Sequence, residues 1–217
     1  MGQTKTVRYG QKMNPTTQET SRNRRREAIM EVAREVFLKD GYAAASMSSI
    51  AARLGGSKGT LYNYFRSKEE LFEAQVREGC ARVADGLFDL KADDRPIAEV
   101  LNALGENYLT TIYSAWAVQT YRVVVAESVR SPQLARIFYE SGPALGLRRL
   151  EIYLEGARAR KLVKMDDCHL AAGEFLSLCR GHQHFIYVLN LEDRPSPERI
   201  KLHAQQAVSL FLRAYGA

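Results

Sequence analysis

The chain has 217 residues, of which 46% are hydrophobic and 26% are charged, and its formal net charge is +6. This composition excludes a disordered or fibrous chain and predicts a globular protein with a sizeable buried core. The chain contains no run of about eighteen apolar residues, so no membrane-spanning helix is expected. The first 23 residues are polar and lack the apolar segment of a secretion signal. Three cysteines in a chain of this length do not indicate a disulfide framework. A cytoplasmic location is therefore expected.

The amino-terminal segment, residues 1–22, is polar and shows no apolar period, so we expect a mobile tail there. From Arg24 on, apolar side chains recur three, four, seven and eight positions apart, which predicts an amphipathic helix. Gly41 follows Lys39 and Asp40, and it is the expected end of this helix because glycine tolerates the left-handed conformation that closes a helix.

Three serines are expected to cap the helices that follow. Ser46 precedes a short helix that ends at the pair Gly55-Gly56, and Ser57 precedes a second short helix. Ser67 begins a capping box, the Ser-x-x-Glu pattern that marks a helix start, before a longer fourth helix.

The rest of the chain continues as helix-length segments at 96–113, 116–130, 132–161, 167–191 and 196–215. Ser141-Gly142-Pro143 is expected to interrupt the third of these segments, because proline removes a donor and clashes with the preceding turn. The predicted fold is all-α with about nine helices. It is divided into a three-helix domain at 23–68 and a larger helical domain at 69–217.

Residues 46–65 have the layout of a helix-turn-helix. Ala51 is small enough for the two helices to approach closely, and Gly55, four residues later, supplies a left-handed turn. The second helix begins with small or cationic residues, so its N-terminus can approach a phosphate backbone, where free N–H groups and the helix dipole favour anions. The pattern predicts DNA binding, with a helical hairpin that carries incidental basic residues as the alternative.

The basic charge is concentrated in the same part of the chain. Residues 1–75 contain 13 Lys and Arg against 8 Asp and Glu, whereas the remaining 142 residues contain 18 against 17. This asymmetry indicates a nucleic acid or an anionic membrane as partner, or only a solvated face. Arg24 to Arg26 and Lys68 are expected to bind the phosphate backbone on both sides of a groove.

Two stretches resemble a known family. S-K-G-T-L-Y-N-Y-F-R-S-K-E-E-L at 57–71, within a match over residues 24–73, resembles the DNA-binding domain of the TetR family of bacterial transcriptional repressors. Residues 120–160, which begin T-Y-R-V-V-V-A-E-S-V-R-S-P-Q-L-A-R-I-F-Y-E-S-G-P, are similar to the C-terminal domain of the AefR-like subgroup. The resemblance implies a homodimer whose two recognition helices bind a palindromic DNA operator, and a C-terminal domain that binds a small inducer.

Position by position, the resemblance implies DNA contacts from the start of the first helix of the pair, from the whole second helix and from the start of the next helix. The implied residues are Ser46, Ser48, Ser57, Lys58, Gly59, Thr60, Tyr62, Asn63, Tyr64 and Lys68. Gly56 departs from the family pattern, which has valine or a similar apolar residue there. We expect looser packing between the two helices, at a cost of about 1–2 kcal/mol.

The resemblance also implies a ligand cavity among the middle helices, with aromatic walls and an apolar or aromatic ligand. The expected ligand-binding residues are Tyr108, Tyr113, Trp116, Tyr121, Arg122 and Phe138, with Tyr139 as a further wall and Glu127 as a further polar anchor. Aromatic residues at helical spacing are also typical of an ordinary hydrophobic core, which remains the alternative for each of them.

The last helix has a broad apolar face. Leu202 and Leu210 lie off its main apolar stripe, so we expect it to be covered both by its own domain and by a partner. The residues therefore predict a homodimer through a bundle of 167–191 and 196–215, independently of the resemblance.

Metal binding and catalysis are less well supported. Cys179, His182 and His184 lie close in the sequence but lack the spacing of a four-ligand zinc site. Neither a G-x-S-x-G motif nor a complete P-loop occurs, so no enzyme, metal or cofactor is expected. A DNA-binding protein of the same fold without an inducer, or a metal-responsive regulator, remains the alternative function.

Overall fold

The computed structural model describes residues 15–87 and 95–217, with side chains at 19–81 and 95–217. Within these ranges the chain consists of helices α1 to α11, and one isolated bridge between Val163 and Gly216 is its only β-type pairing. The all-α prediction is confirmed. None of the helices in the described ranges is long and apolar enough to span a membrane.

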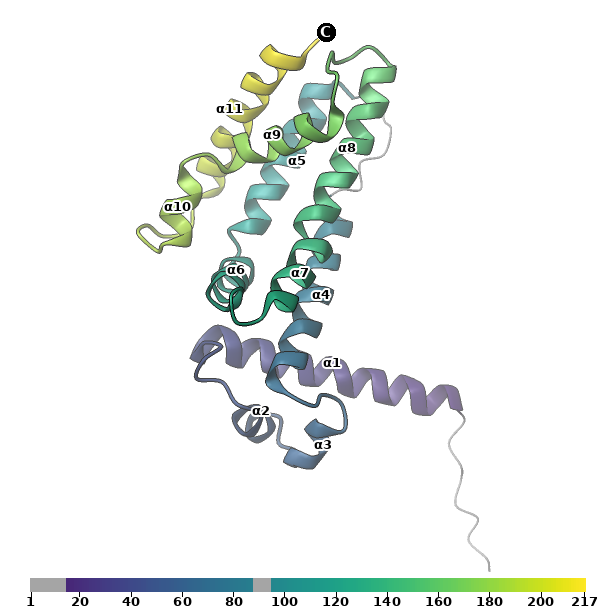
Figure 1. Cartoon of the computed structure of the whole chain (residues 1–217), viewed down its shortest axis with the longest axis vertical. Helices are drawn as coiled ribbons and strands as arrows, with labels where there is room; N and C mark the ends of the chain where they lie inside the picture. Colours follow the sequence, from purple (N-terminus) through teal and green to yellow (C-terminus); the bar gives the residue numbers. More distant parts are fainter. Residues whose placement is uncertain (1–14, 88–94) are drawn as a thin grey trace, which may run out of the picture. The chain divides into compact units, whose positions relative to one another are not determined.

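The chain forms two compact units, Met1–Leu71 and Phe72–Ala217. Helix α4 (Lys68–Leu87) begins in the first unit and continues into the second. Figure 1 shows the helices of both units, coloured along the chain.

The first unit contains α1 (Pro15–Asp40), α2 (Met47–Arg53) and α3 (Lys58–Tyr62). The prediction of a tail through residue 22 is wrong for 15–22, which belong to α1; residues 1–14 lie outside the described ranges. Pro15 suits the first helical position because its φ is fixed, and the polar residues 19–24 are exposed. Apolar periodicity detects only helices that bury a face, so it missed this part.

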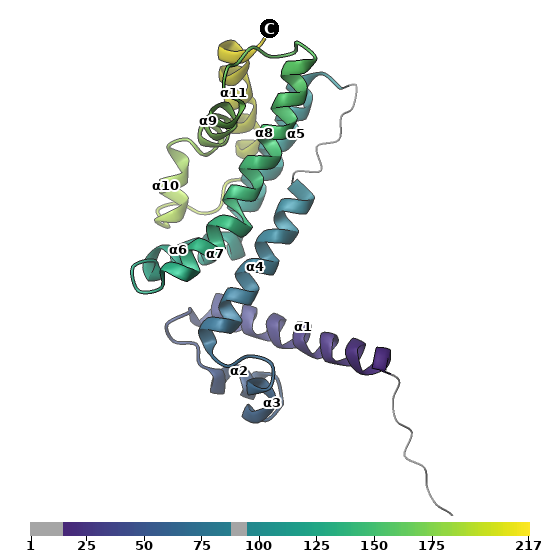
Figure 2. The ribbon, with the colours of Figure 1, turned by 45° about the vertical axis from the view of Figure 1, so that its right-hand side comes forward.

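Helices α2 and α3 lie beside each other on one side of α1 (Figures 1 and 2). Fully buried aliphatic side chains from all three helices form the core of the unit: Ile29, Ala33, Val36, Ile50 and Leu61. Gly41 ends α1 at φ +80° and Gly55 ends α2 at φ +65°, as predicted, because only glycine adopts this conformation without a steric penalty.

The second unit packs four long helices around one core: α5 (Ile97–Ile112), α8 (Pro143–Ala159), α9 (Cys168–Arg180) and α11 (Pro197–Tyr215). Phe175 of α9 and Phe211 of α11 meet at its centre, with ring centroids 5.3 Å apart and both side chains fully buried. Three further helices belong to the same unit: α6 (Ala115–Glu127), α7 (Pro132–Ser141) and α10 (Gln183–Val188).

Two breaks divide the segments expected from the sequence. Gly142 separates α7 from α8, with Pro143 at the first position of α8, as predicted. The segment 167–191 was predicted as one helix, but it is two, because Gly181 takes φ +51° between α9 and α10. The break turns α10 out of line with α9 (Figure 1), so its side chains occupy positions that a continuous helix would not reach.

Candidate DNA-binding unit and ligand pocket

A reciprocal capping box fixes the start of α2. The Ser46 hydroxyl accepts the N–H of Ser49 at 3.1 Å, and the Ser49 hydroxyl accepts the N–H of Ser46 at 3.0 Å. Ile50 and Ala51 are buried, whereas Ser46 and Ser48 are exposed. Capping therefore holds the two predicted contact residues at the solvent side of a packed helix.

Helix α3 is short and fastened at two points. The Ser57 hydroxyl accepts the N–H of Thr60 at 3.1 Å, and Leu61 is fully buried. The predicted contact residues Lys58, Gly59, Tyr62 and Asn63 are exposed, while Thr60 and Tyr64 are half-buried. The Lys58 ammonium lies 6.0 Å from the centroid of the Tyr62 ring. The structure thus brings these side chains together on the outer face of α3.

Lys68 lies at the start of α4, where the predicted capping box takes a modified form. The Ser67 hydroxyl accepts the N–H of Glu70 at 3.1 Å, but the Glu70 carboxylate accepts the N–H of Arg66, at 2.7 Å, in place of that of Ser67. The Lys68 ammonium donates to the Tyr42 carbonyl at 2.9 Å. An ammonium has three donors, so Lys68 keeps capacity for a phosphate while it fastens the segment after α1.

The departure at Gly56 does not leave a gap in the core. Gly56 is half-exposed, and a Cβ there would lie 3.0 Å from a guanidinium nitrogen of Arg25 and 4.0 Å from a methyl of Leu54. The Arg26 guanidinium in turn lies 5.4 Å from the centroid of the Phe65 ring. The looser packing expected from a truncated core position is therefore not what the structure shows, because an arginine of α1 lies where the apolar side chain would begin.

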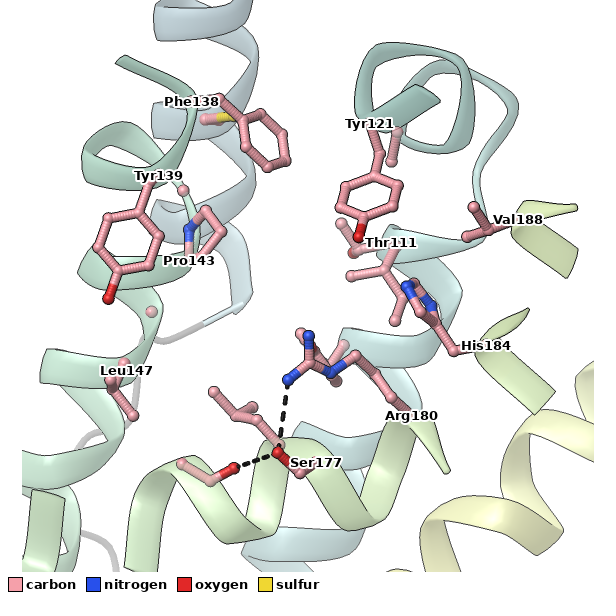
Figure 3. A pocket seen from close by; sticks show the side chains of 18 of the residues that line it. Thr111, Tyr121, Phe138, Tyr139, Pro143, Leu147, Ser177, Arg180, His184 and Val188 are labelled. Atoms are coloured by element: carbon pink, nitrogen blue, oxygen red, sulfur yellow. Dashed lines mark hydrogen bonds between the residues drawn. The ribbon is translucent and has the colours of Figure 1, made fainter. Parts of the chain in front are cut away.

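The second unit contains a cavity of about 770 Å³. It is lined mostly by apolar and aromatic side chains from α4 to α10, among them the predicted residues Tyr108, Trp116, Tyr121 and Phe138, and also Tyr139. Figure 3 shows Phe138, Pro143 and Leu147 on one side of this space and Tyr121, Thr111 and His184 on the other. Its volume lies within the usual range of small-molecule sites.

Tyr113, Arg122 and Glu127 are not among the residues that line the cavity. Tyr113 is 3% exposed, packs edge-on against Tyr187 and donates to the Arg180 carbonyl at 3.5 Å. Arg122 donates from Nε to the Val188 carbonyl at 2.7 Å and from Nη2 to the Tyr187 carbonyl at 3.0 Å, so it caps the end of α10. The family resemblance indicated this region, but neither the resemblance nor helical spacing tells which neighbouring helix covers a given face.

The polar groups of the cavity were missed from the sequence. Arg180, in the last turn of α9, projects into the cavity and donates to the Ser177 hydroxyl at 3.4 Å (Figure 3). His184 of α10 also lines it, and its buried Nδ1 has no hydrogen-bond partner in the described ranges. Burial, and after it the charge of Arg180, lowers the pKa of His184, so both favour the neutral ring.

The alternative of a metal-responsive regulator would require a cluster of metal-binding side chains. In the part of the chain that the structure describes, no group of three His, Cys, Asp or Glu side chains converges to hold an ion. Cys179 is 2% exposed and belongs to the core, and burial raises its pKa to about 12, whereas His182 is exposed.

The chain combines a helix-turn-helix unit, whose second helix is capped and exposed, with an all-helical unit that contains a cavity. This combination is typical of DNA-binding transcriptional regulators. Residues 29–75 match the family model of bacterial regulatory proteins of the tetR family. Residues 99–217 match that of the C-terminal domain of AefR-like transcriptional repressors. The chain belongs to the TetR family.

Among solved structures, the chain is similar to the flavonoid-responsive regulator FrrA, with 37% identity and a TM-score of 0.72 over 89% of this chain and 98% of FrrA. It is also similar to a regulator assigned to the TetR family from Mesorhizobium loti MAFF303099, with 26% identity and a TM-score of 0.84 over 90% and 98% of the two chains.

The similarity to curated proteins is partial. The HTH-type transcriptional repressor AcnR of Corynebacterium diphtheriae is 37% identical over 33% of this chain and 37% of its own length. The HTH-type transcriptional regulator UidR of Escherichia coli K12 is 31% identical over 51% of this chain and 55% of its own length. The chain thus spans about half or less of these relatives.

Proposed function

We propose that this protein is a repressor that binds a palindromic operator as a homodimer and leaves it when a small molecule enters the cavity. The observation that carries the proposal is the face of α3, where Lys58, Tyr62 and Asn63 are exposed around the fully buried anchor Leu61. A short helix held in this way presents its side chains to the major groove, where base edges are bound, while neighbouring basic groups bind phosphates. The ten residues expected to contact DNA belong to this proposal.

Exposed leucines on two helices support the homodimer. Leu170 and Leu178 of α9 are 56% and 40% exposed, and Leu202 and Leu210 of α11 are each 52% exposed. Apolar faces of this kind are typical of surfaces that a partner covers. A second copy that covers them by two-fold symmetry would present two α3 helices, which matches a palindromic operator.

The place of α4 supports control by a ligand. Its first residues belong to the same compact unit as α3, whereas Cys80, further along the same helix, lines the cavity. Trp116 of the cavity wall lies so close to Gly79 that a Cβ there would be 2.3 Å from its ring. A ligand that displaces Trp116 or Cys80 therefore acts on the helix that continues into the DNA-binding unit.

The cavity also bears on the alternative of an architectural protein without an inducer, because ligand-sized volume is the feature that such a protein would lack. FrrA is named for its response to flavonoids. Since FrrA is similar over most of the chain, aromatic compounds of that class are the first candidates for the inducer.

Footprinting on the DNA that flanks the protein's own gene tests the proposal. We expect a protected site with two symmetric halves, and loss of protection when an effective ligand is added. Lys58→Ala should remove protection without changing helix content. Protection that survives Lys58→Ala and every aromatic candidate would contradict both the assignment of α3 and the role of the cavity.

A further inference from the structure

Arg180 is an exposed residue of the last turn of α9, and its guanidinium lies at the largely apolar cavity, which its side chain helps to line. In the described ranges its side chain makes one hydrogen bond, to the neutral Ser177 hydroxyl at 3.4 Å, and no carboxylate lies within ion-pair distance. The carboxylate of Glu174, which also lines the cavity, accepts the Tyr215 hydroxyl. A guanidinium carries five N–H donors, so most of those of Arg180 remain available to a ligand.

His184 provides a second, independent unpaired group in the same wall. Its Nδ1 is buried without a hydrogen-bond partner in the described ranges, and its ring packs edge-on against Tyr121, with centroids 5.6 Å apart. Buried polar atoms are normally paired. Figure 3 shows Arg180 beside His184, with the Tyr121 hydroxyl pointing toward that side of the cavity.

The opposite wall has a different character. Phe138, Pro143 and Leu147 face the space from α7 and α8 and offer no hydrogen-bonding side chain (Figure 3). Trp116, also in the lining, adds a further flat apolar surface. Tyr139 of α7 adds one hydroxyl on this side, whereas the charged and imidazole groups lie on α9 and α10. The cavity is therefore more polar at the α9–α10 side than at the α7–α8 side, which suits a ligand with one polar end and a flat ring system.

We propose that the cavity binds an aromatic acid, whose anionic oxygen pairs with the Arg180 guanidinium while its rings lie against Phe138, Pro143 and Trp116. The oxygen belongs to a carboxylate or to an ionised phenol, both of which accept charge-assisted hydrogen bonds from arginine. The His184 Nδ1 pairs with a second polar atom near the same end. The identification of this acid with the inducer rests on the proposed function, whereas its binding does not.

Other classes of ligand fit less well. A neutral apolar ligand would displace water from the part of the Arg180 guanidinium that faces the cavity and would supply no counter-charge or acceptor in return. A cation would be repelled by Arg180, although the Glu174 carboxylate, which accepts one hydrogen bond from Tyr215, keeps acceptor capacity. A multiply charged anion would place charge against Phe138 and Leu147.

Two pairs of probes test the charge requirement: 7-hydroxyflavone with flavone, and 2-naphthoate with 2-naphthamide. Trp116 is the only tryptophan of the chain and lines the cavity, so quenching of its fluorescence in the full-length protein at pH 8 measures binding without DNA. Charged hydrogen bonds are strong enough that the acid of at least one pair should bind about tenfold or more tighter than its neutral partner. The pair that shows the preference identifies phenolate or carboxylate.

Variants assign the preference to one residue. Arg180→Gln should abolish the ratio between acid and neutral probe, Arg180→Lys should retain part of it, and Arg148→Gln, at an exposed arginine of α8 that does not line the cavity, should leave it unchanged. The ratio is measured within each protein, so a general loss of stability does not imitate the result. Equal binding of acid and neutral probe by the wild type, no quenching by any probe, or an unchanged ratio in Arg180→Gln would overturn the proposal.

Operator release is measured in parallel by fluorescence anisotropy. If the acids bind through Arg180 but the operator stays bound, the ligand assignment stands and the proposed inducible function fails. If flavone and 2-naphthamide release the operator as well as 7-hydroxyflavone and 2-naphthoate do, the inducible function stands and the aromatic-acid assignment is overturned.

Discussion

Replacement of Gly79 by alanine tests the contact between α4 and α6 beside the cavity. A Cβ at residue 79 would lie 2.3 Å and 2.4 Å from Cζ2 and Cη2 of Trp116, and 3.2 Å from Cε2. Carbon atoms in ordinary contact are about 3.5–4.0 Å apart, so the indole must retreat by about 1.2 Å or more. The glycine thus provides the notch in α4 that holds the tryptophan.

Two opposing effects set the size of the change. Alanine in place of glycine inside a helix stabilises by about 1 kcal/mol, whereas overpacking a filled site costs about 1–3 kcal/mol. Gly156 of α8 is the matched control, because a Cβ there has no neighbour within 4 Å. Gly156→Ala should therefore raise the free energy of unfolding by about 1 kcal/mol. The free energy of unfolding of the Gly79→Ala variant should be lower than that of the Gly156→Ala variant by about 1–3 kcal/mol.

Urea unfolding of both variants at one protein concentration measures this difference, and Trp116 emission reports the ring's surroundings in the same samples. Gly79→Ala should shift the emission of the folded protein, and Trp116→Leu in the Gly79→Ala background should recover most of the stability, because the smaller side chain removes the clash. If Gly79→Ala stabilises as much as Gly156→Ala and leaves the emission unchanged, Trp116 does not lie against Gly79.

Three further predictions concern individual side chains. Arg122→Ala should lower the free energy of unfolding by about 2 kcal/mol, because the end of α10 loses the side chain that caps it. The variant should still bind acidic probes more tightly than neutral ones. Loss of that preference would place Arg122 in the cavity. Ser57→Ala should cost about 1 kcal/mol through loss of the bond to the Thr60 N–H, measured by urea unfolding, and no change would mean that the cap is not formed. Burial raises the pKa of Cys80 to about 11 and of Cys179 to about 12. These two thiols at pH 8 should therefore react with a disulfide reagent at least about 100-fold more slowly in the native protein than in urea, and rapid native labelling of either one would contradict its burial.

The features that the sequence predicted correctly are the starts, ends and breaks of helices. Ser46 and Ser57 cap their helices, Gly41 and Gly55 end theirs, and Gly142 breaks α7 from α8. Each of these features depends on residues within one or two turns, so the pattern alone determines it.

The cavity was predicted less completely because it depends on contacts between distant segments. Tyr108 and Trp116 lie in its wall, but Tyr113 occupies the core and Arg122 caps a helix. The sequence did not mark Arg180 as a cavity residue, because an arginine in the last turn of a helix is common for electrostatic reasons. Arg180 lines the cavity because the chain turns at Gly181 and because helices from other parts of the sequence form the opposite wall. The residues of α9 alone do not predict either feature.

The central claim, that α3 binds DNA through its exposed face, is tested most directly by anisotropy titration of operator DNA over a series of salt concentrations. The proteins compared are the wild type, Lys58→Ala and Lys164→Ala, the last at an exposed lysine of the second unit. Lys58→Ala should weaken binding and reduce the slope of log affinity against log salt by about 1 for each phosphate that is no longer neutralised, while Lys164→Ala matches the wild type. Identical affinity and slope for Lys58→Ala and the wild type would contradict the account.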